Sequence, residues 1–538
     1  MIGVITVLAR LVGFGRQVVF AHTVGTTCLG TAYTTANMVP NIIYDIVLGG
    51  ALSSVVVPVL AGPALDAVRP ELAGEGADSA RRIASALLTW TVILLVPVSA
   101  VLALAAHPIV TVLLSHAAGC PRTVMAGVGA RMLIVFAPQV LLYGLAVVLY
   151  GILQSYRRFG APALAPLLSS LVVIGAYAGF GAIGGEYVFG NRLHELPPLS
   201  EYLLSGGTTL GVVALVATAV YPARRLRIGM RPMLRFPPGV GARVRRLALA
   251  GVVTLVAQDA SAAVVIVLAN RYGSTGALVI YGFAWAVFMV PYAVLAVPIA
   301  TSAFPALSAT STTGGTSAPA PAADGSFDET SAISTRAVMV ASWLGAAALV
   351  GARVPVANVF ESHDAMAAVS LARALAAFAP GLVGYGISAN LSRVLYARGR
   401  NRATALAIGG GWLLVIVADL VIVPFVPQAR VVQALGLGMS VGLTVTGIAL
   451  LILVRRERGS VALHGVSRAF IAGLVGAVAG AAAGSLLADA LSAPGFAVNV
   501  GITVLVTAVV IAVFAAVAGS LDGGDLRAAL ARLRARPS

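Results

Sequence analysis

Two apolar stretches near the start of the chain decide the fold: RLVGFGRQVVFA (10–21) and NMVPNIIYDIVLGGALSSVVVPVL (37–60). Both are hydrophobic enough for a lipid bilayer, yet they carry five polar residues, Arg10, Arg16, Asn37, Asn41 and Asp45. A charged side chain at the centre of a transmembrane helix costs at least about 2.5–3.5 kcal/mol. We therefore expect these side chains to face one another or a polar chamber of which this helix pair forms one wall.

The composition places the chain among membrane proteins. Of 538 residues 59% are hydrophobic and 10% charged, and the mean hydropathy is +0.97, whereas soluble domains are about 25% charged. Apolar runs of about 20 residues recur throughout, which predicts an all-α polytopic membrane protein. No phosphate-binding P-loop is present, so we expect a protein that is not an enzyme and not an ATPase. The arginine-rich stretch 224–246 has no nucleic-acid motif, and no nucleic-acid partner is expected.

The hydropathy pattern predicts about fourteen transmembrane helices. Their ranges are 2–23, 31–62, 83–106, 123–153, 162–184, 203–221, 246–270, 278–307, 336–357, 367–396, 403–424, 431–454, 467–492 and 496–519. Arginines concentrate in the loops after even-numbered spans, with eight between residues 224 and 246. The positive-inside rule then puts both termini in the cytoplasm.

A weak internal repeat suggests how the spans are grouped. Prolines follow MV at 38–40 and again at 289–291, and a second proline comes later in each of these spans. This offset of six spans predicts two parallel six-helix lobes around a central cavity, plus two extra C-terminal helices. The expected parts are an N-lobe of spans 1–6 (1–230), the start of the C-lobe (231–308), a flexible cytoplasmic linker (309–335), the rest of the C-lobe (336–455), spans 13–14 (456–520) and a cytoplasmic tail (521–538).

Several motifs resemble the MurJ/MviN family of lipid II flippases, within the multidrug/oligosaccharidyl-lipid/polysaccharide exporter superfamily. They are RLVGFGR (10–16), N-x-x-P-N (37–41) followed by VP (57–58), GILQSYRRFGAPALAP (151–166), VPYAVLAVPIATSAFPALS (290–308) and LYARGRNRAT (395–404). The chain is similar to a divergent, actinobacterial-type member. The resemblance implies a cationic cavity that alternates between inward- and outward-facing states, and a lipid-tail groove beside spans 13 and 14.

The same resemblance implies a function, a location and partners. It predicts a transporter that flips lipid II from the inner to the outer leaflet of the bacterial cytoplasmic membrane for peptidoglycan synthesis. Expected partners are lipid II, membrane lipids and proteins of cell-wall synthesis or division. The alternatives are a polysaccharide-unit flippase or cation-coupled drug antiporter of the same superfamily, or a non-transporting cell-wall scaffold.

The chain also departs from the family pattern. Members commonly carry an arginine where Tyr44 stands and another where Ala286 stands, and an acidic residue where Thr31 stands. Arg10 and Arg16 therefore remain as the cationic pair by position. Guanidinium groups bind phosphate through two parallel hydrogen bonds, so we expect this pair to bind the substrate. The alternative is that they only anchor the first helix at its cytoplasmic end.

The polar stripe on the second span is the next candidate. Asn37, Asn41 and Asp45 recur every four residues, which places them on one helix face. We expect that face to line the cavity, with Asp45 able to pair with Arg16 or Arg10. Hydrogen bonding between helices is the alternative role.

Three buried polar residues are candidates for ion coupling: Gln258, Asp259 and Asp419. No cofactor is expected beyond a coupling ion, and no metal ligand is certain. Sodium would suit the hard oxygen donors, a protonatable carboxylate is the rival interpretation, and structural pairing is the third.

An aromatic stripe on the eighth span includes Tyr281 and Trp285, which could stack on a sugar or line a portal; simple packing is the alternative. Cys28 and Cys120 both map to the outer side, where a disulfide is one option.

Overall fold

The computed structural model is helical throughout the described part of the chain. It describes residues 2–46, 56, 59–63, 73–114, 119–189, 193–226, 231–312, 321–361, 364–491 and 493–521, and no strand occurs among them. The predicted all-α class is confirmed, and the many long apolar helices make this a multi-pass membrane protein. A bilayer favours this outcome because a helix satisfies its own backbone hydrogen bonds.

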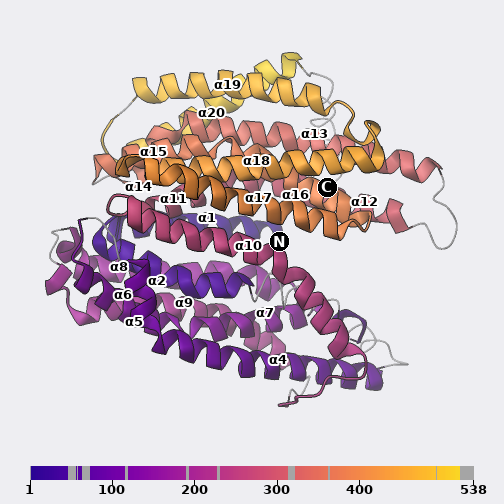
Figure 1. Cartoon of the computed structure of the whole chain (residues 1–538), viewed down its shortest axis with the longest axis horizontal. Coiled ribbons are helices and arrows are strands. Elements are labelled where there is room, and N and C mark those ends of the chain that lie inside the picture. The colour runs from indigo at the N-terminus through magenta and orange to yellow at the C-terminus, as the bar shows by residue number, and fades with distance from the viewer. Residues whose placement is uncertain are drawn as a thin grey trace. The chain divides into compact units, whose positions relative to one another are not determined.

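The helices divide into two compact units, Met1–Val279 and Ile280–Ser538. In unit 1, drawn from indigo to magenta in Figure 1, α8 packs against both α1 and α9, while α2 packs on α6 and α4 on α7. Its helices are α1 (Ile2–Thr23), α2 (Cys28–Asp45), α4 (Ala73–Leu104), α5 (Ala106–Leu113), α6 (Arg122–Phe136), α7 (Gln139–Ser155), α8 (Gly160–Phe189), η2 (Leu193–Glu195), α9 (Pro198–Arg225) and α10 (Val240–Tyr272).

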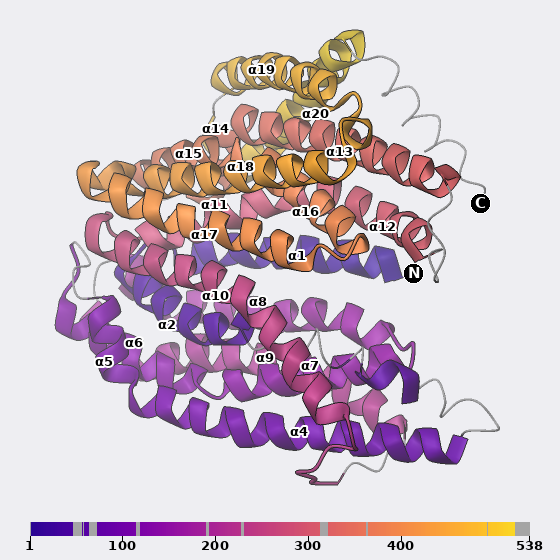
Figure 2. The same ribbon diagram turned by 45° about the vertical axis from the view of Figure 1, so that its right-hand side comes forward.

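Unit 2 holds the remaining helices, in which α18 packs against α15, α16 and α17, and α19 packs against both α13 and α20 (Figure 2). They are α11 (Ala277–Pro291), the π-helical turn η3 (Tyr292–Ala296), α12 (Val297–Thr312), α13 (Pro321–Gly351), α14 (Arg353–Phe360), α15 (Ala365–Phe378), α16 (Gly381–Ala397), α17 (Asn401–Ile422), η4 (Val423–Phe425), η5 (Gln428–Arg430), α18 (Val431–Arg458), η6 (Val461–Leu463), α19 (Val466–Ala490) and α20 (Phe496–Leu521).

Helices occupy each of the fourteen predicted span positions. Within the described residues, ten helical segments are long and apolar enough to cross a membrane, or eleven if the bent pair α15 and α16 counts as one span. The pair is bent by 45°. The helices α1, α2 and α10 are outside that set, so the full count of fourteen stays a prediction, as do the predicted parts of the chain other than the linker.

The predicted flexible linker 309–335 is wrong for its second half. α12 continues to Thr312, and α13 begins at Pro321; residues 313–320 lie outside the described part, as does the tail after Leu521. The side chain of Phe327 is fully buried, and Asp328 accepts two hydrogen bonds from Arg458, each of 2.8 Å. These contacts from a distant helix order a segment that looks featureless in sequence.

Close helix packing in unit 2 depends on glycine. A Cβ atom at Gly384 in α16 would collide with the backbone of Leu443 in α18, and Gly447 faces Gly384 in turn. Small residues let two helix backbones approach in this way. The α16–α18 pair is therefore set by this steric fit together with a hydrogen bond, in which the N–H of Gly381 donates to Ser440 Oγ at 3.0 Å.

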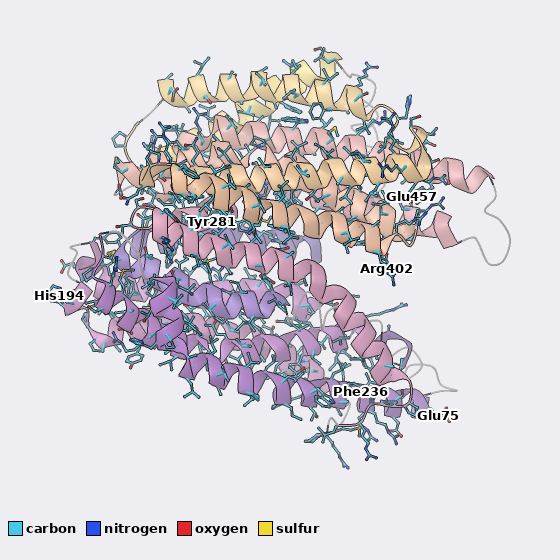
Figure 3. All side chains as sticks on the ribbon, in the orientation of Figure 1. Glu75, His194, Phe236, Tyr281, Arg402 and Glu457 are labelled. Atoms are coloured by element: carbon cyan, nitrogen blue, oxygen red, sulfur yellow. A yellow bond between two sulfur atoms is a disulfide. The ribbon has the colours of Figure 1, made fainter. Side chains whose placement is uncertain are left out.

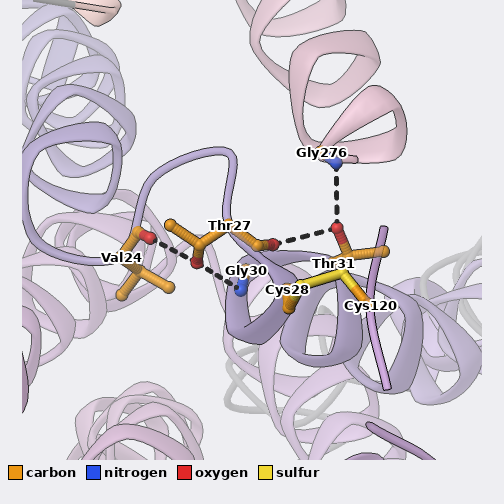
Figure 4. Close-up of a disulfide and its surroundings, with 7 residues drawn as sticks. All are labelled: Val24, Thr27, Cys28, Gly30, Thr31, Cys120 and Gly276. Carbon is orange, nitrogen blue, oxygen red and sulfur yellow. Dashed lines mark hydrogen bonds between the residues drawn. A yellow bond between two sulfur atoms is a disulfide. The ribbon is translucent and has the colours of Figure 1, made fainter. Parts of the chain in front are cut away.

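One end of unit 1 is tied together by a disulfide between Cys28 and Cys120, shown in Figure 4. Beside it, the N–H of Gly276 donates to Thr31 Oγ1 at 3.1 Å, and Thr27 caps α2 through the N–H of Gly30. Three loops predicted to share one side of the membrane therefore meet here. His194 lies toward one end of unit 1 and Glu75 toward the other (Figure 3), as the alternation of loops predicts.

Removing this disulfide should lower the stability of the whole protein. The bond closes a loop across a sequence separation of 92, and the chain-entropy model assigns such a loop about 4–5 kcal/mol. We expect Cys28→Ser to lower the Tm in detergent by about 5–10 °C. The double variant Cys28→Ser/Cys120→Ser should match the single one, and a reductant should lower the Tm of the parent alone. A parent protein that titrates with two free thiols would contradict the bond.

Candidate functional site

The polar stripe of α2 is tied to α7 inside unit 1. The Asn41 amide donates to the Asn37 carbonyl at 2.8 Å, and the Tyr143 hydroxyl donates to Asn41 Oδ1 at 3.3 Å. The rings of Tyr44 and Tyr143 lie 4.1 Å apart between centroids. Asn37, Asn41 and Asp45 are all half-buried. The residue at the family's usual arginine position, Tyr44, thus supports Tyr143 from one side.

Arg16 faces the same region from α1. It is half-buried, and its charge reaches the hydroxyls of Tyr143 and Tyr177. Arg10 is exposed two turns earlier. The expected pairing with Asp45 is absent: in the described part of the chain Asp45 forms no ion pair with either arginine. The structure therefore brings Arg16 together with tyrosine hydroxyls instead of a carboxylate.

A buried hydroxyl network, which sequence reasoning missed, supports Tyr177. Its hydroxyl lies 2.8 Å from that of Tyr33, which lies 2.8 Å from Thr208 Oγ1. The Phe20 ring packs 5.2 Å from each of the two tyrosine rings. Tyr177 in α8 is thereby fixed beside α1, the helix that carries Arg16.

A second missed feature is an ion pair between two membrane helices. Arg131 in α6 donates to both carboxylate oxygens of Glu201 in α9, at 2.9 and 2.8 Å. The Glu201 side chain is only 9% exposed. The available signal was one arginine and one glutamate in otherwise apolar stretches, which must find partners in lipid. Because both charges are satisfied by each other, this pair is structural.

Of the ion-coupling candidates, two lie in α10 of unit 1. Asp259 is 3% exposed, and its Oδ2 has no hydrogen-bond partner among the described residues. It lies close enough to Asp45 for the two charges to interact. Gln258 is half-buried. Asp259 and Asp45 thus form an acidic pair on the polar side of unit 1, near Tyr143.

Asp419 lies in α17 of unit 2 and is fully buried. Neither of its carboxylate oxygens has a hydrogen-bond partner in the described part of the chain. Gly438 of α18 packs directly on the carboxylate and leaves no room for a Cβ atom. No group of three or more acidic, His or Cys side chains gathers among the described residues. Asp259 and Asp419 belong to different units, and their joint ion site stays a prediction.

The aromatic stripe of the eighth span is a packing surface within unit 2. Tyr281 is 7% exposed and contacts Phe378, with ring centroids 5.5 Å apart. Trp285 stacks on Phe288 at 5.3 Å, and Tyr292 stacks on Tyr385 at 4.2 Å. Simple packing, the alternative considered from sequence, describes these contacts, whereas a sugar-binding role for Tyr281 and Trp285 stays a prediction.

Comparison with known proteins places these features in a family. The family model "Lipid II flippase MurJ" matches residues 20–517. The lipid II flippase MurJ of Burkholderia cenocepacia is 26% identical over 484 residues, covering 88% of this chain and 86% of that protein. A probable lipid II flippase MurJ of Synechocystis is 28% identical over 246 residues. That alignment spans 45% of this chain and 42% of the Synechocystis protein, less than half of its length.

Solved structures show the same fold. A lipid II flippase MurJ in an inward closed conformation aligns with a TM-score of 0.68 at 17% identity, covering 96% of this chain and 98% of that one. An inward-facing multidrug resistance transporter of the MATE family gives 0.63 at 14% identity, covering 84% and 94%. The family model covers most of the chain, and the chain belongs to the MurJ family.

Proposed function

We propose that this chain flips lipid II from the inner to the outer leaflet of the bacterial cytoplasmic membrane by alternating access, and so supplies peptidoglycan synthesis. It acts as a transporter and performs no catalysis. The match to the family model and the names of the aligned MurJ proteins support this proposal. The proposed orientation, with both termini in the cytoplasm, follows from the loop arginines.

One observation carries the proposal: Arg16 is half-buried in α1, a predicted membrane span, and forms no ion pair with a carboxylate in the described part of the chain. A guanidinium held in such surroundings favours an incoming anion, because burial costs free energy that a counter-charge recovers. The pyrophosphate of lipid II has the charge and geometry to bind it.

The neighbours of Arg16 suit the rest of a headgroup. Tyr143 and Tyr177 present hydroxyls, and Asn37 has a buried amide oxygen with no partner among the described residues. Hydroxyls and amides recognise sugars by hydrogen bonding, and they would orient the headgroup once Arg16 holds its phosphate. The apolar prenyl tail stays in the hydrocarbon of the bilayer, so its transfer into the protein is not required.

An ion gradient would supply the free energy for transport. We propose that Asp419 takes up the coupling ion, either a proton or sodium, because a fully buried carboxylate without hydrogen bonds is costly when charged and unpaired. Asp259 offers a similar oxygen in unit 1. The proposed partners beyond lipid II are membrane lipids and proteins of cell-wall synthesis or division; nucleic acid is not among them.

The Arg16 proposal predicts that Arg16→Ala lowers the rate of lipid II translocation at least tenfold. Losing a charge-assisted hydrogen bond costs about 1.5–3 kcal/mol, and 1.4 kcal/mol is a factor of ten. Arg16→Lys should retain part of the activity, because it keeps the charge and loses the two-pronged geometry. The measurement is the leaflet distribution of lipid II in cells depleted of the parent protein and complemented with each variant.

The matched control is Arg430→Ala, which removes an exposed arginine at the start of α18 and should complement fully. Normal lipid II distribution with Arg16→Ala would contradict headgroup binding by Arg16. Normal distribution after depletion of the protein itself would favour the scaffold or another exported substrate.

The coupling proposal predicts that Asp419→Asn removes stimulation of transport by an ion gradient. Asparagine keeps the shape of the side chain but neither titrates nor carries charge. Proteoliposomes with a proton gradient, a sodium gradient or none would be compared, and the gradient that stimulates the parent identifies the ion. Stimulation that persists in Asp419→Asn would exclude Asp419 from coupling; Asp259→Asn would then be tested in the same way.

A further inference from the structure

A polar cavity of about 320 Å³ lies at one end of unit 2, where α16 turns into α17 and α18 ends. Figure 3 shows two residues of that end, Arg402 and Glu457. Asp419 lies eighteen residues after Asn401, the first residue of α17, which is about 27 Å along the helix axis. The cavity is thus separate from the proposed ion-coupling residue of this unit. Its polar walls are formed by Arg398, Gly399, Arg400, Glu457 and Arg458.

Two of the wall arginines are held on one aromatic ring. The guanidinium carbon of Arg398 lies 4.8 Å from the centre of the Phe327 ring, and that of Arg458 lies 5.7 Å from it. Arg458 is fixed further by its two hydrogen bonds to Asp328, in which the side chains are only 15% and 12% exposed. Two guanidinium groups are therefore held at one ring, and the Asp328 carboxylate neutralises the charge of Arg458.

Arg400, the third arginine of the cavity wall, lies on its solvent-exposed side. Arg400 donates to Glu457 at 2.7 Å, and the Arg400 side chain is 56% exposed. The cavity wall contains three arginines and one glutamate. Asp328 adds one further carboxylate from α13, so positive charge remains in excess. The N-terminus of α17, which begins at Asn401, adds the positive end of its dipole.

Phosphate groups match this arrangement. Guanidinium groups that are already oriented bind phosphate with little loss of conformational freedom, and basic pockets between transmembrane helices at the membrane surface suit anionic headgroups. We propose that this arginine cavity binds a phosphate group, carried either by an anionic lipid of the adjacent leaflet or by a soluble phosphate compound. Binding would connect the α16–α17 turn to α18 and, through Phe327 and Asp328, to α13.

Titration of the full-length protein in detergent tests the cavity. Short-chain phosphatidylglycerol, short-chain phosphatidylcholine and sodium pyrophosphate would each be added while the Tm is measured, since a ligand of the folded state raises it. We expect phosphatidylglycerol to raise the Tm in a saturable way and phosphatidylcholine to leave it unchanged. An equal effect of pyrophosphate would identify a soluble phosphate compound as the source; an effect of the lipid alone would identify the headgroup.

Variants separate the cavity from the general surface charge. Arg398→Gln/Arg400→Gln should raise the half-saturating concentration at least fivefold, whereas the matched pair Arg455→Gln/Arg456→Gln, outside the cavity wall, should change it less than twofold. Glu457→Gln removes the carboxylate that competes for Arg400 and should lower that concentration. The proposal is overturned if neither phosphate probe raises the Tm of the parent, or if the two double variants weaken binding equally. Should Arg398→Gln/Arg400→Gln fail to fold, an unchanged titration of Glu457→Gln overturns it.

Discussion

The lipid bilayer offers no water to buried polar groups, and most features of this chain follow from that constraint. Backbone groups are satisfied within helices, and the buried side chains find partners: Arg131 closes on Glu201, and Tyr33 joins Tyr177 to Thr208. Arg16 and Asp419 are two of the exceptions among the described residues, since Arg16 forms no ion pair with a carboxylate and the oxygens of Asp419 accept no hydrogen bond. Burying an unpaired charge in such a medium costs free energy, which a bound ligand or ion recovers. Both residues are therefore central to the proposed transport.

Both units meet the constraint with side-chain hydrogen bonds between helices. Unit 1 places hydroxyls, amides and charges on neighbouring helices, and these side chains support one another through direct hydrogen bonds. In unit 2 the Asn390 amide donates to Ser334 and Thr335 at 3.1 and 3.0 Å. Close backbone contact, as at Gly384 and Gly447, and stacked rings such as Tyr292 and Tyr385 add to these bonds. Even the position of Asp419 depends on a missing side chain, because only glycine fits at position 438. In the proposed function unit 1 supplies polar side chains for the headgroup, and unit 2 supplies the buried Asp419 carboxylate.

Local patterns in the sequence predicted what depends on local physics. Hydropathy located the helices, and the four-residue spacing placed Asn37, Asn41 and Asp45 on one face. Local patterns do not predict tertiary contacts. Tyr143 joins the site through a hydrogen bond to Asn41, 102 residues earlier, and the sequence around neither residue indicates this contact. The segment 321–335 looks like a linker because its partner, Arg458, lies 130 residues away from Asp328. Likewise, the spacing of the aromatic residues predicts that Tyr281 and its neighbours share one helix face. It does not predict that this face packs against Phe378.

The disulfide has a consequence for biogenesis. Helices α2, α4 and α5 lie between Cys28 and Cys120 along the chain, and disulfides persist where the compartment is oxidising. In the proposed orientation both sulfurs reach the outside only if every intervening segment has been inserted in the right direction. A chain with one span inverted or skipped would leave Cys120 on the reducing side. A free thiol at Cys28 therefore indicates that the first helices were inserted incorrectly. Quality control can use that one thiol to distinguish correctly inserted from misinserted copies.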